Sequence, residues 1–276
     1  MSTARGGWEL PIGEDELVRL TKDLDEAHRE TLPVMRVSAA GLVEQIRAGG
    51  SGDGREVPGR AGPADPGRRR FLLGAGGVGA AFLLAACSGE KEGAAPADGP
   101  ASPVADTVTY TGDLKVVALS VALENQAVGA YRATLAAAKA GRLGTVPPAV
   151  STFVTTAMAQ HADHAKAWNA VLTGAGKPAI TDVPLSNQKS VTAALGRAKN
   201  VGEAAGLALQ LEDQAAQTYL FATYNVKSAA GIETAATIAP VEAMHAAILR
   251  FVLGQYPVPD AFLPVDKAAK TSLLTV

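Results

Sequence analysis

Two short segments of the sequence place metal-ligand side chains three residues apart. Glu242 precedes His245 by three residues, and His161 precedes His164 by the same spacing. Residues i and i+3 lie on the same face of an α-helix, so each pair can offer two donor atoms to one ion. Carboxylate oxygen and imidazole nitrogen are donors that suit iron or manganese, and also zinc. The two pairs therefore indicate metal-binding chemistry carried on helices.

These polar residues interrupt helical faces that are otherwise apolar. The residues at helical spacing from His245 include Val241, Ile248, Leu249 and Val252. A carboxylate or imidazole buried on such a face is costly unless another group pairs with it. A single Glu or His there is usually a hydrogen-bonded core residue, whereas several together favour a shared ion.

Two further carboxylates occur in segments that repeat each other. Leu123-Glu-Asn-Gln-Ala-Val-Gly-Ala-Tyr131 shares its Leu, Glu, Gln, Ala and Tyr with Leu211-Glu-Asp-Gln-Ala-Ala-Gln-Thr-Tyr219, and His161-x-x-His164 aligns with Glu242-x-x-His245. Repeats of this kind also arise from packing alone. Here, however, each of four segments carries a ligand-type side chain on its apolar face. We therefore predict six metal ligands: Glu124, His161, His164, Glu212, Glu242 and His245.

Tyr131 and Tyr219 occupy equivalent positions two turns beyond Glu124 and Glu212. Their phenols can hydrogen-bond to a ligand carboxylate, or their rings can relay an electron to the centre. The residues leave both interpretations open. We place the two tyrosines beside the ligands and not among them.

Hydrophobic periodicity and Gly/Pro positions predict the helices that carry these residues. Gly141 suits the position after a helix end, and Pro147 and Pro148 suit a first turn. One connection is long and the other two are short, which predicts an all-α four-helix bundle of two repeated hairpins with one long crossover. The predicted helices are roughly 113–140, 147–174, 201–226 and 231–253, with a short helix at 187–199 outside the bundle.

Composition agrees with a helical protein and limits its partners. Aromatic residues make up 5% of the chain while 47% is hydrophobic, and the net charge is −2. The scarcity of aromatics, together with abundant Ala, favours closely packed helices over sheets. The near-neutral charge gives no support for nucleic-acid binding. The Ala-rich faces serve either close helix packing or a homodimer contact.

The single cysteine ends an apolar run that follows a basic cluster. Arg68 and Arg69 stand just before the run 71–86, which ends in Leu84-Ala-Ala-Cys87. This order predicts a secretory signal. Its Arg-Arg-x-Phe-Leu order resembles a twin-arginine signal, which exports folded proteins. Leu-Ala-Ala-Cys resembles a lipobox, in which Cys87 becomes the lipidated first residue of a bacterial lipoprotein. The alternative is an uncleaved anchor, for which sixteen residues are short.

The predicted signal divides the chain into segments. If the chain is exported through it, we expect lipid at Cys87 to hold the protein on the outer face of the cytoplasmic membrane. The helical pattern within 14–47 contains Asp25-x-x-His28, which we assign to a solvated helix face because charges flank it. This segment is either cytoplasmic and removed on export, or upstream of the true start. The predicted divisions are an extension and linker (1–67), the signal (68–87), a flexible tether (88–109), the bundle (110–265) and a C-terminal tail (266–276).

The bundle resembles the ferritin-like, di-iron carboxylate proteins. Their pattern is one Glu from each of two helices and Glu-x-x-His from each of the other two. Glu124, Glu212 and the pair Glu242 with His245 match three elements, and His164 matches the His of the fourth. Val-Glu-Ala-Met-His-Ala-Ala-Ile-Leu-Arg250 and Pro-Val-Pro-Asp-Ala-Phe262 resemble segments of the bacterial and fungal group that includes desiccation-related proteins.

The resemblance implies a dinuclear iron or manganese centre that handles oxygen, peroxide or Fe²⁺ in envelope stress protection. It would make the protein a metal-dependent oxidase, ferroxidase or peroxide-consuming enzyme. One departure weighs against this: His161 stands where the family has Glu. Fewer anionic ligands stabilise a ferric pair less, so the alternatives are a mononuclear site, a zinc site or a weakly redox-active pair. A further alternative is that His161 lies outside the ligand set and orients a ligand carboxylate. The second hypothesis is therefore a metal-binding or structural envelope lipoprotein without turnover.

Overall fold

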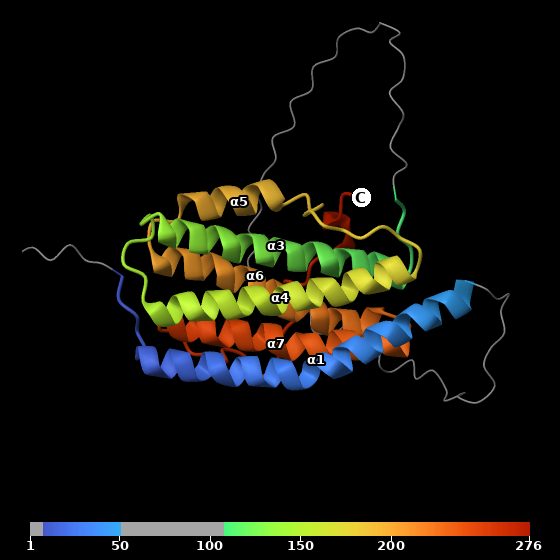
Figure 1. The fold of residues 1–276 in the computed structure, drawn as a ribbon, viewed down its shortest axis with the longest axis horizontal. Coiled ribbons are helices and arrows are strands. Elements are labelled where there is room, and N and C mark those ends of the chain that lie inside the picture. Colours follow the sequence, from blue (N-terminus) through green and yellow to red (C-terminus); the bar gives the residue numbers. More distant parts are fainter. Residues whose placement is uncertain (1–7, 51–107) are drawn as a thin grey trace, which may run out of the picture. The chain divides into compact units, whose positions relative to one another are not determined.

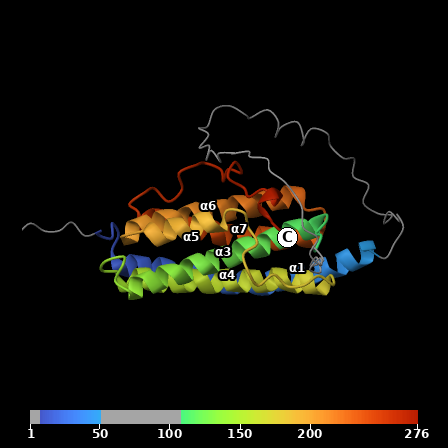
Figure 2. The same cartoon turned by 90° about the horizontal axis from the view of Figure 1, so that it is seen from above.

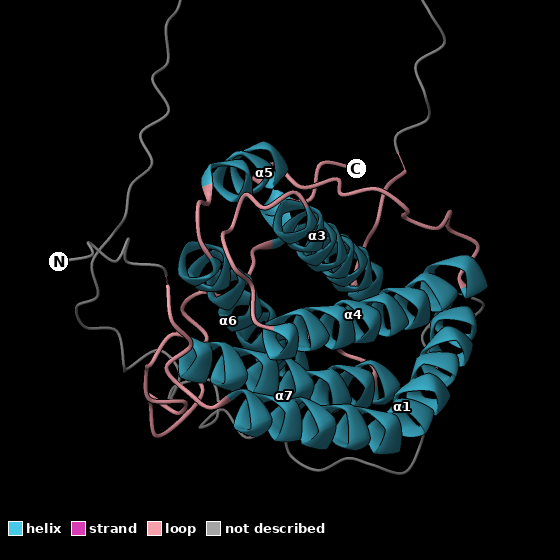
Figure 3. Ribbon diagram, turned by 60° about the vertical axis from the view of Figure 1, so that its left-hand side comes forward, coloured by secondary structure: helices cyan, strands magenta, loops and turns pink. Residues whose placement is uncertain are grey.

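The computed structural model describes residues 8–50 and 108–276 of the chain. Within these residues every regular element is helical, and the one β-type pairing is an isolated bridge between Leu185 and Leu274 (Figure 3). The all-α prediction is confirmed. The elements are α1 (Glu14–Gly50), α3 (Asp113–Lys139), α4 (Pro148–Gly174), α5 (Gln188–Arg197), α6 (Val201–Asn225), α7 (Ala229–Val252) and the 3-10 helix η1 (Thr271–Leu273).

Helices α3, α4, α6 and α7 form the predicted bundle. α3 packs along α4 and α6 packs along α7, which makes two hairpins (Figure 1). The connection between the hairpins contains α5, which lies against α3 outside the bundle and has no buried residue. The observed bounds agree with the predicted ones to within about two residues, the usual uncertainty of a helix end.

Local signals explain where the helices stop and start. Gly141, after α3, has a φ of 70°, a conformation that glycine adopts without strain. The next residue, Arg142, donates its backbone N–H to the carbonyl of Ala137 over 3.0 Å and so satisfies a free helix-end acceptor. At the start of α6, the side chain of Asn200 accepts from the N–H of Glu203 over 2.8 Å. These local contacts set where α3 ends and where α6 begins.

The N-terminal helix α1 packs on the bundle as a fifth long helix, along α4 and α7 (Figures 1 and 2). Ser38 and Thr234 join α1 to α7 through a 2.8 Å hydroxyl contact. Arg47 donates to the carbonyl of Gly174 at the end of α4 over 2.9 Å. The buried face of α1 repeats every three to four residues and consists of Leu17, Thr21, Leu24, His28, Met35, Ser38, Ala39, Leu42 and Val43.

The expectation of a solvated face at Asp25-x-x-His28 is wrong for His28, whose side chain is 3% exposed. The neighbouring charges, such as the ion pair of Arg19 with Glu16, do face solvent. His28 falls in register with Leu24 and Met35, so the apolar face that docks on the bundle carries the imidazole inward with it.

The C-terminal tail is bound to the bundle by backbone hydrogen bonds. Lys267 donates its N–H to the side chain of Gln217 over 2.7 Å, and Ala269 donates to the hydroxyl of Thr218 over 2.8 Å. Thr275 donates to the carbonyl of Pro184 over 2.9 Å. The tail therefore covers part of α6.

The predicted signal with Arg68, Arg69 and Cys87, and the tether up to residue 107, lie outside the described residues. Among the described helices, only α7 is long and apolar enough to cross a membrane. More than half of its most apolar window is buried in the protein, and Glu242 and His245 lie within that helix. It is therefore a core helix of the bundle.

Candidate metal centre

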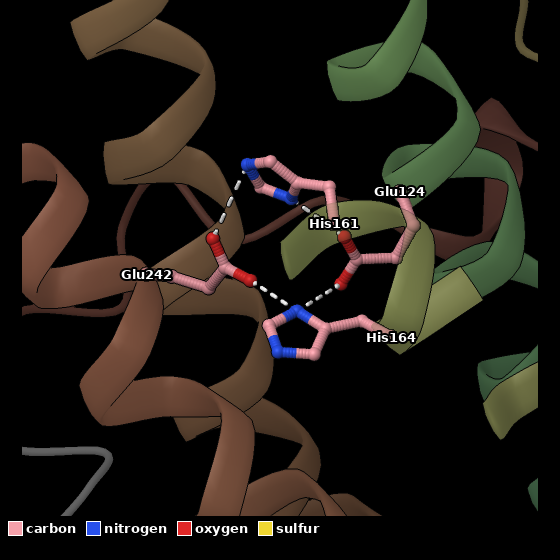
Figure 4. A group of neighbouring side chains, drawn as sticks. All are labelled: Glu124, His161, His164 and Glu242. Carbon is pink, nitrogen blue, oxygen red and sulfur yellow. Dashed lines mark hydrogen bonds and ion pairs between the residues drawn. The ribbon is translucent and has the colours of Figure 1, made fainter. Parts of the chain in front are cut away.

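All six predicted ligands meet in the middle of the bundle. α3 supplies Glu124 and α6 supplies Glu212, while the i, i+3 pairs come from α4 and α7. Each of the six side chains is at most 2% exposed. Because each stands on the inner face of its own helix, helix packing alone brings three carboxylates and three imidazoles into one water-excluded cluster. Figure 4 shows four of them: Glu124, His161, His164 and Glu242.

The cluster contains two groups with the spacing of metal ligands. The first is Glu124, His161, His164 and Glu242, and the second is His161, Glu212, Glu242 and His245. Within each group the donor atoms lie within 4.8 Å of one another. His161 and Glu242 belong to both groups. The arrangement is therefore that of two adjacent ion positions with two residues in common.

The carboxylate of Glu242 faces both positions, one oxygen toward each. Its Oε1 lies 2.9 Å from Nδ1 of His164, and its Oε2 lies 3.1 Å from Nδ1 of His245. The outer carboxylates complete each side. Glu124 Oε1 is 3.5 Å from His164 Nδ1, and Glu212 Oε2 is 3.3 Å from His245 Nδ1. Glu242 thus has the geometry of a bridging ligand.

Two buried atoms in the first group test whether an ion fits. Nδ1 of His164 and Oε1 of Glu242 are both inaccessible and have no hydrogen-bond partner, although they lie 2.9 Å apart. Two donors bound at right angles to one ion at 2.0–2.2 Å would be separated by about 3 Å. Either a proton on His164, which makes the two atoms an ion pair, or one shared cation satisfies both. The residues present therefore fit a metal ion.

His161 sits between the two outer carboxylates. Its Nδ1 lies 2.7 Å from Glu124 Oε2, and its Nε2 lies 3.0 Å from Glu212 Oε1. A neutral imidazole has only one N–H and cannot donate to two carboxylates. His161 therefore carries a proton on both nitrogens, or it offers a lone pair to an ion. Either state places or binds positive charge between Glu124 and Glu212.

The carboxylates and imidazoles shift one another's pKa values. Burial alone would raise the pKa of Glu124, but the charge of His164 and the hydrogen bond from His161 hold it at about 2. Burial would lower the pKa of His164, but Glu124 and Glu242 raise it to about 9. Without a metal, the imidazoles thus keep protons that balance the charges of Glu124 and Glu212. A bound cation takes over that role, so metal uptake releases protons.

The two tyrosines hydrogen-bond crosswise between the hairpins. Tyr131 of α3 donates to Oε1 of Glu212 on α6, and Tyr219 of α6 donates to Oε1 of Glu124 on α3. Trp168 donates to the hydroxyl of Tyr219 over 3.0 Å. Burial and the adjacent carboxylates raise the pKa of both phenols well above the usual value. They therefore remain protonated donors that orient the outer carboxylates.

Sequence reasoning missed two residues around the cluster. Gln160, 2% exposed, accepts from Nε2 of His245 over 2.8 Å. It lies four residues before His164, and this i, i+4 spacing on one helical face was the signal available. His28 of α1 packs on His164, with ring centroids 5.2 Å apart. Burial, reinforced by His164, lowers the pKa of His28 to about 4. Both residues contact ligands without joining either ligand group.

The fold and the cluster together define a helical bundle protein with a buried carboxylate–histidine site compatible with metal. The model of the ferritin-like domain family matches residues 112–255, more than half of the chain. The chain therefore belongs to the ferritin-like domain family. The match covers α3 to α7 and leaves out α1. No curated protein and no solved structure matches the chain.

Proposed function

We propose that this protein holds two iron or manganese ions and uses them to handle oxygen, peroxide or Fe²⁺. The observation that carries the proposal is the position of Glu242, which has one carboxylate oxygen directed toward each of two ligand groups. A single zinc site would need only one such group. Membership of the ferritin-like domain family supports the same conclusion.

Iron or manganese would supply the exchange of electrons with an oxidant, which a carboxylate bundle cannot perform by itself. The side chains of the chain do the rest. Glu124, Glu212 and Glu242 would balance the charge of the ions, and the three imidazoles, once they release their protons, would provide neutral donors. The phenols of Tyr131 and Tyr219 keep their protons and hold the outer carboxylates in place.

A small cavity between α3 and α6 favours a small substrate. Its volume is about 10 Å³, and Glu124 and His161 form its inner wall. A space of this size accommodates about one water molecule. The remaining lining residues are Leu123, Gln126, Ala127, Leu211, Gln214 and Ala215. Leu211, Gln214 and Ala215 are half-buried, so the cavity lies next to the cluster and close to the protein surface. A space of this size favours oxygen, peroxide or a metal ion over an organic substrate.

Metal analysis and turnover on one preparation test this proposal. The untagged full chain is expected to carry about two iron or manganese ions and to oxidise Fe²⁺ or consume peroxide. Glu212→Ala removes the outer carboxylate of the second group and should lower turnover at least ~100-fold while the helical circular dichroism persists. Turnover that survives Glu212→Ala would argue against the cluster as its source.

A second candidate function is metal binding without turnover, and His161 is the observation that favours it. The cluster offers three carboxylates and three imidazoles, and His161 lies between Glu124 and Glu212. Three carboxylates and three imidazoles stabilise a ferric pair less than four carboxylates and two imidazoles do. They also suit zinc better. About one zinc per chain in the same analysis, with no near-ultraviolet absorption from ferric ions, would favour this candidate.

We further propose that the protein is a bacterial lipoprotein exported by a twin-arginine signal and anchored through Cys87. The support is the order of Arg68, Arg69, the apolar run and Leu-Ala-Ala-Cys87. An extracytoplasmic centre that consumes oxidants would suit envelope stress or desiccation protection. The likeness of the segments that end at Arg250 and Phe262 to the desiccation-related group supports that setting.

Lipid labelling tests the anchor. In a bacterial host supplied with labelled palmitate, the native chain is expected in the detergent-soluble membrane fraction, labelled and beginning at Cys87. Cys87→Ala should remove the label, because the thiol is the acceptor. The double variant Arg68→Lys with Arg69→Lys should keep the chain unprocessed in the cytoplasm. Label on the Cys87→Ala protein would contradict this assignment.

A further inference from the structure

Helix α1 brings two polar side chains, Asp25 and His28, to the side of the centre where α4 and α7 meet. They are three residues apart, so they lie one turn apart on one face of α1. The family match does not include this helix. His28 is 3% exposed, and the Asp25 side chain is 31% exposed. The face of α1 that packs on the bundle therefore carries a second carboxylate–histidine pair.

His28 contacts the first ligand group through His164. The two ring centroids are 5.2 Å apart, with the ring planes at 58°. Nε2 of His28 is inaccessible and has no hydrogen-bond partner. A leucine would fill the same place without leaving a polar atom unpaired, so packing alone does not explain this residue. Its ring closes the side of His164 that faces α1 and restricts the rotation of that ligand.

Asp25 reaches the second ligand group through Gln160. The side-chain amide of Gln160 donates to Oδ1 of Asp25 over 3.5 Å, and its oxygen accepts from Nε2 of His245 over 2.8 Å. This chain of contacts fixes the tautomer of His245, since the proton must lie on Nε2. Nδ1, 3.1 Å from Glu242 Oε2, is then the nitrogen that can offer a lone pair to an ion once it has released its proton. A ligand imidazole usually has such a partner on its other nitrogen.

We propose that Asp25 and His28 of α1 are positioning residues of the metal centre, each acting on one histidine ligand. Asp25 orients Gln160 and thereby His245, and His28 orients His164. The proposal rests on the proposed function, because it requires that the six clustered residues bind metal. With these two residues, five helices build the metal centre of this chain, although four helices suffice to supply the ligands. His28 itself belongs to neither ligand group.

The test uses the full chain loaded with Co²⁺, whose visible absorption reports the geometry of its ligands. His28→Leu and Asp25→Ala are expected to weaken Co²⁺ binding about 10- to 100-fold, the typical effect of losing an outer partner of a ligand. They should also shift the visible bands and speed the loss of Co²⁺ to a chelator. Thermal unfolding of each metal-free variant measures any loss of stability separately.

Two matched variants separate positioning from packing. Glu26→Ala removes a neighbouring exposed carboxylate from α1. Leu42→Ala truncates an equally buried leucine of α1 that lies fourteen residues from His28, so it weakens the packing of α1 away from Asp25 and His28. Both are expected to retain the native Co²⁺ spectrum and affinity. Native spectrum and release rate in His28→Leu and Asp25→Ala would overturn the proposal, as would equal effects in Leu42→Ala. If the native chain binds no Co²⁺ at all, the proposed metal function fails together with this inference.

Discussion

Replacing Glu242 by alanine is expected to empty both ion positions of the centre at once. Each oxygen of its carboxylate faces a different histidine ligand, at 2.9 Å from His164 and 3.1 Å from His245. Loss of this residue therefore removes a donor from both groups. The loss of metal affinity should exceed the roughly 10- to 100-fold loss that follows when a residue that only contacts a metal ligand is removed. The native chain is expected to hold about two ions. Metal analysis of the Glu242→Ala variant by mass spectrometry should find almost none.

Two further variants show whether that loss reports ligation. Glu242→Gln keeps the size of the side chain but not its charge, and should also fail to hold two ions. Glu233→Ala makes the same chemical change at an exposed position of the same helix and should leave the metal content unchanged. Native metal content in Glu242→Ala would show that Glu242 does not bridge two ions.

Removal of α1 is expected to destabilise the bundle strongly. Leu17, Leu24 and Leu42 are fully buried where α1 packs on α4 and α7. Each fully buried leucine contributes about 1.5–3 kcal/mol, so their loss alone should lower the free energy of unfolding by roughly 5 kcal/mol. For a chain of this size that corresponds to a fall in Tm of about 10–20 °C. Thermal unfolding of the full chain and of residues 88–276 measures it.

Restoring the helix as a separate chain is the control. A peptide of residues 8–50 should bind residues 88–276 and recover most of the lost Tm, because the buried face of α1 is continuous. Val37→Ala, which truncates a side chain that is 74% exposed on the outer face of α1, should have little effect. If residues 88–276 are as stable as the full chain, α1 is dispensable to the fold.

The outcome bears directly on export. Cleavage before Cys87 would separate α1 from α3 in the chain. If α1 stabilises the bundle as expected, the exported protein must keep it bound as a second chain or expose the apolar face of α4 and α7. A stable fragment of residues 88–276 would instead fit an α1 that is lost during processing.

Much of the bundle could be predicted from the sequence because its signals are local. Apolar residues at helical spacing, Gly141 after α3 and Pro148 in the first turn of α4 depend on neighbours within a few residues. The i, i+3 spacing of Glu242 and His245 depends on the helix alone, as does the repeat that pairs Glu124 with Glu212. The sequence by itself therefore determined the helices and the six residues that meet at the centre.

Only the tertiary structure decided how these residues face one another. The crossed hydrogen bonds of Tyr131 and Tyr219 and the two-sided contacts of His161 join residues on different helices. The burial of His28 depends on which helices α1 packs against, and the flanking charges on α1 suggested solvent instead. A periodic apolar face shows that a helix packs on something, but which partner it meets follows only from the three-dimensional complementarity of the whole domain.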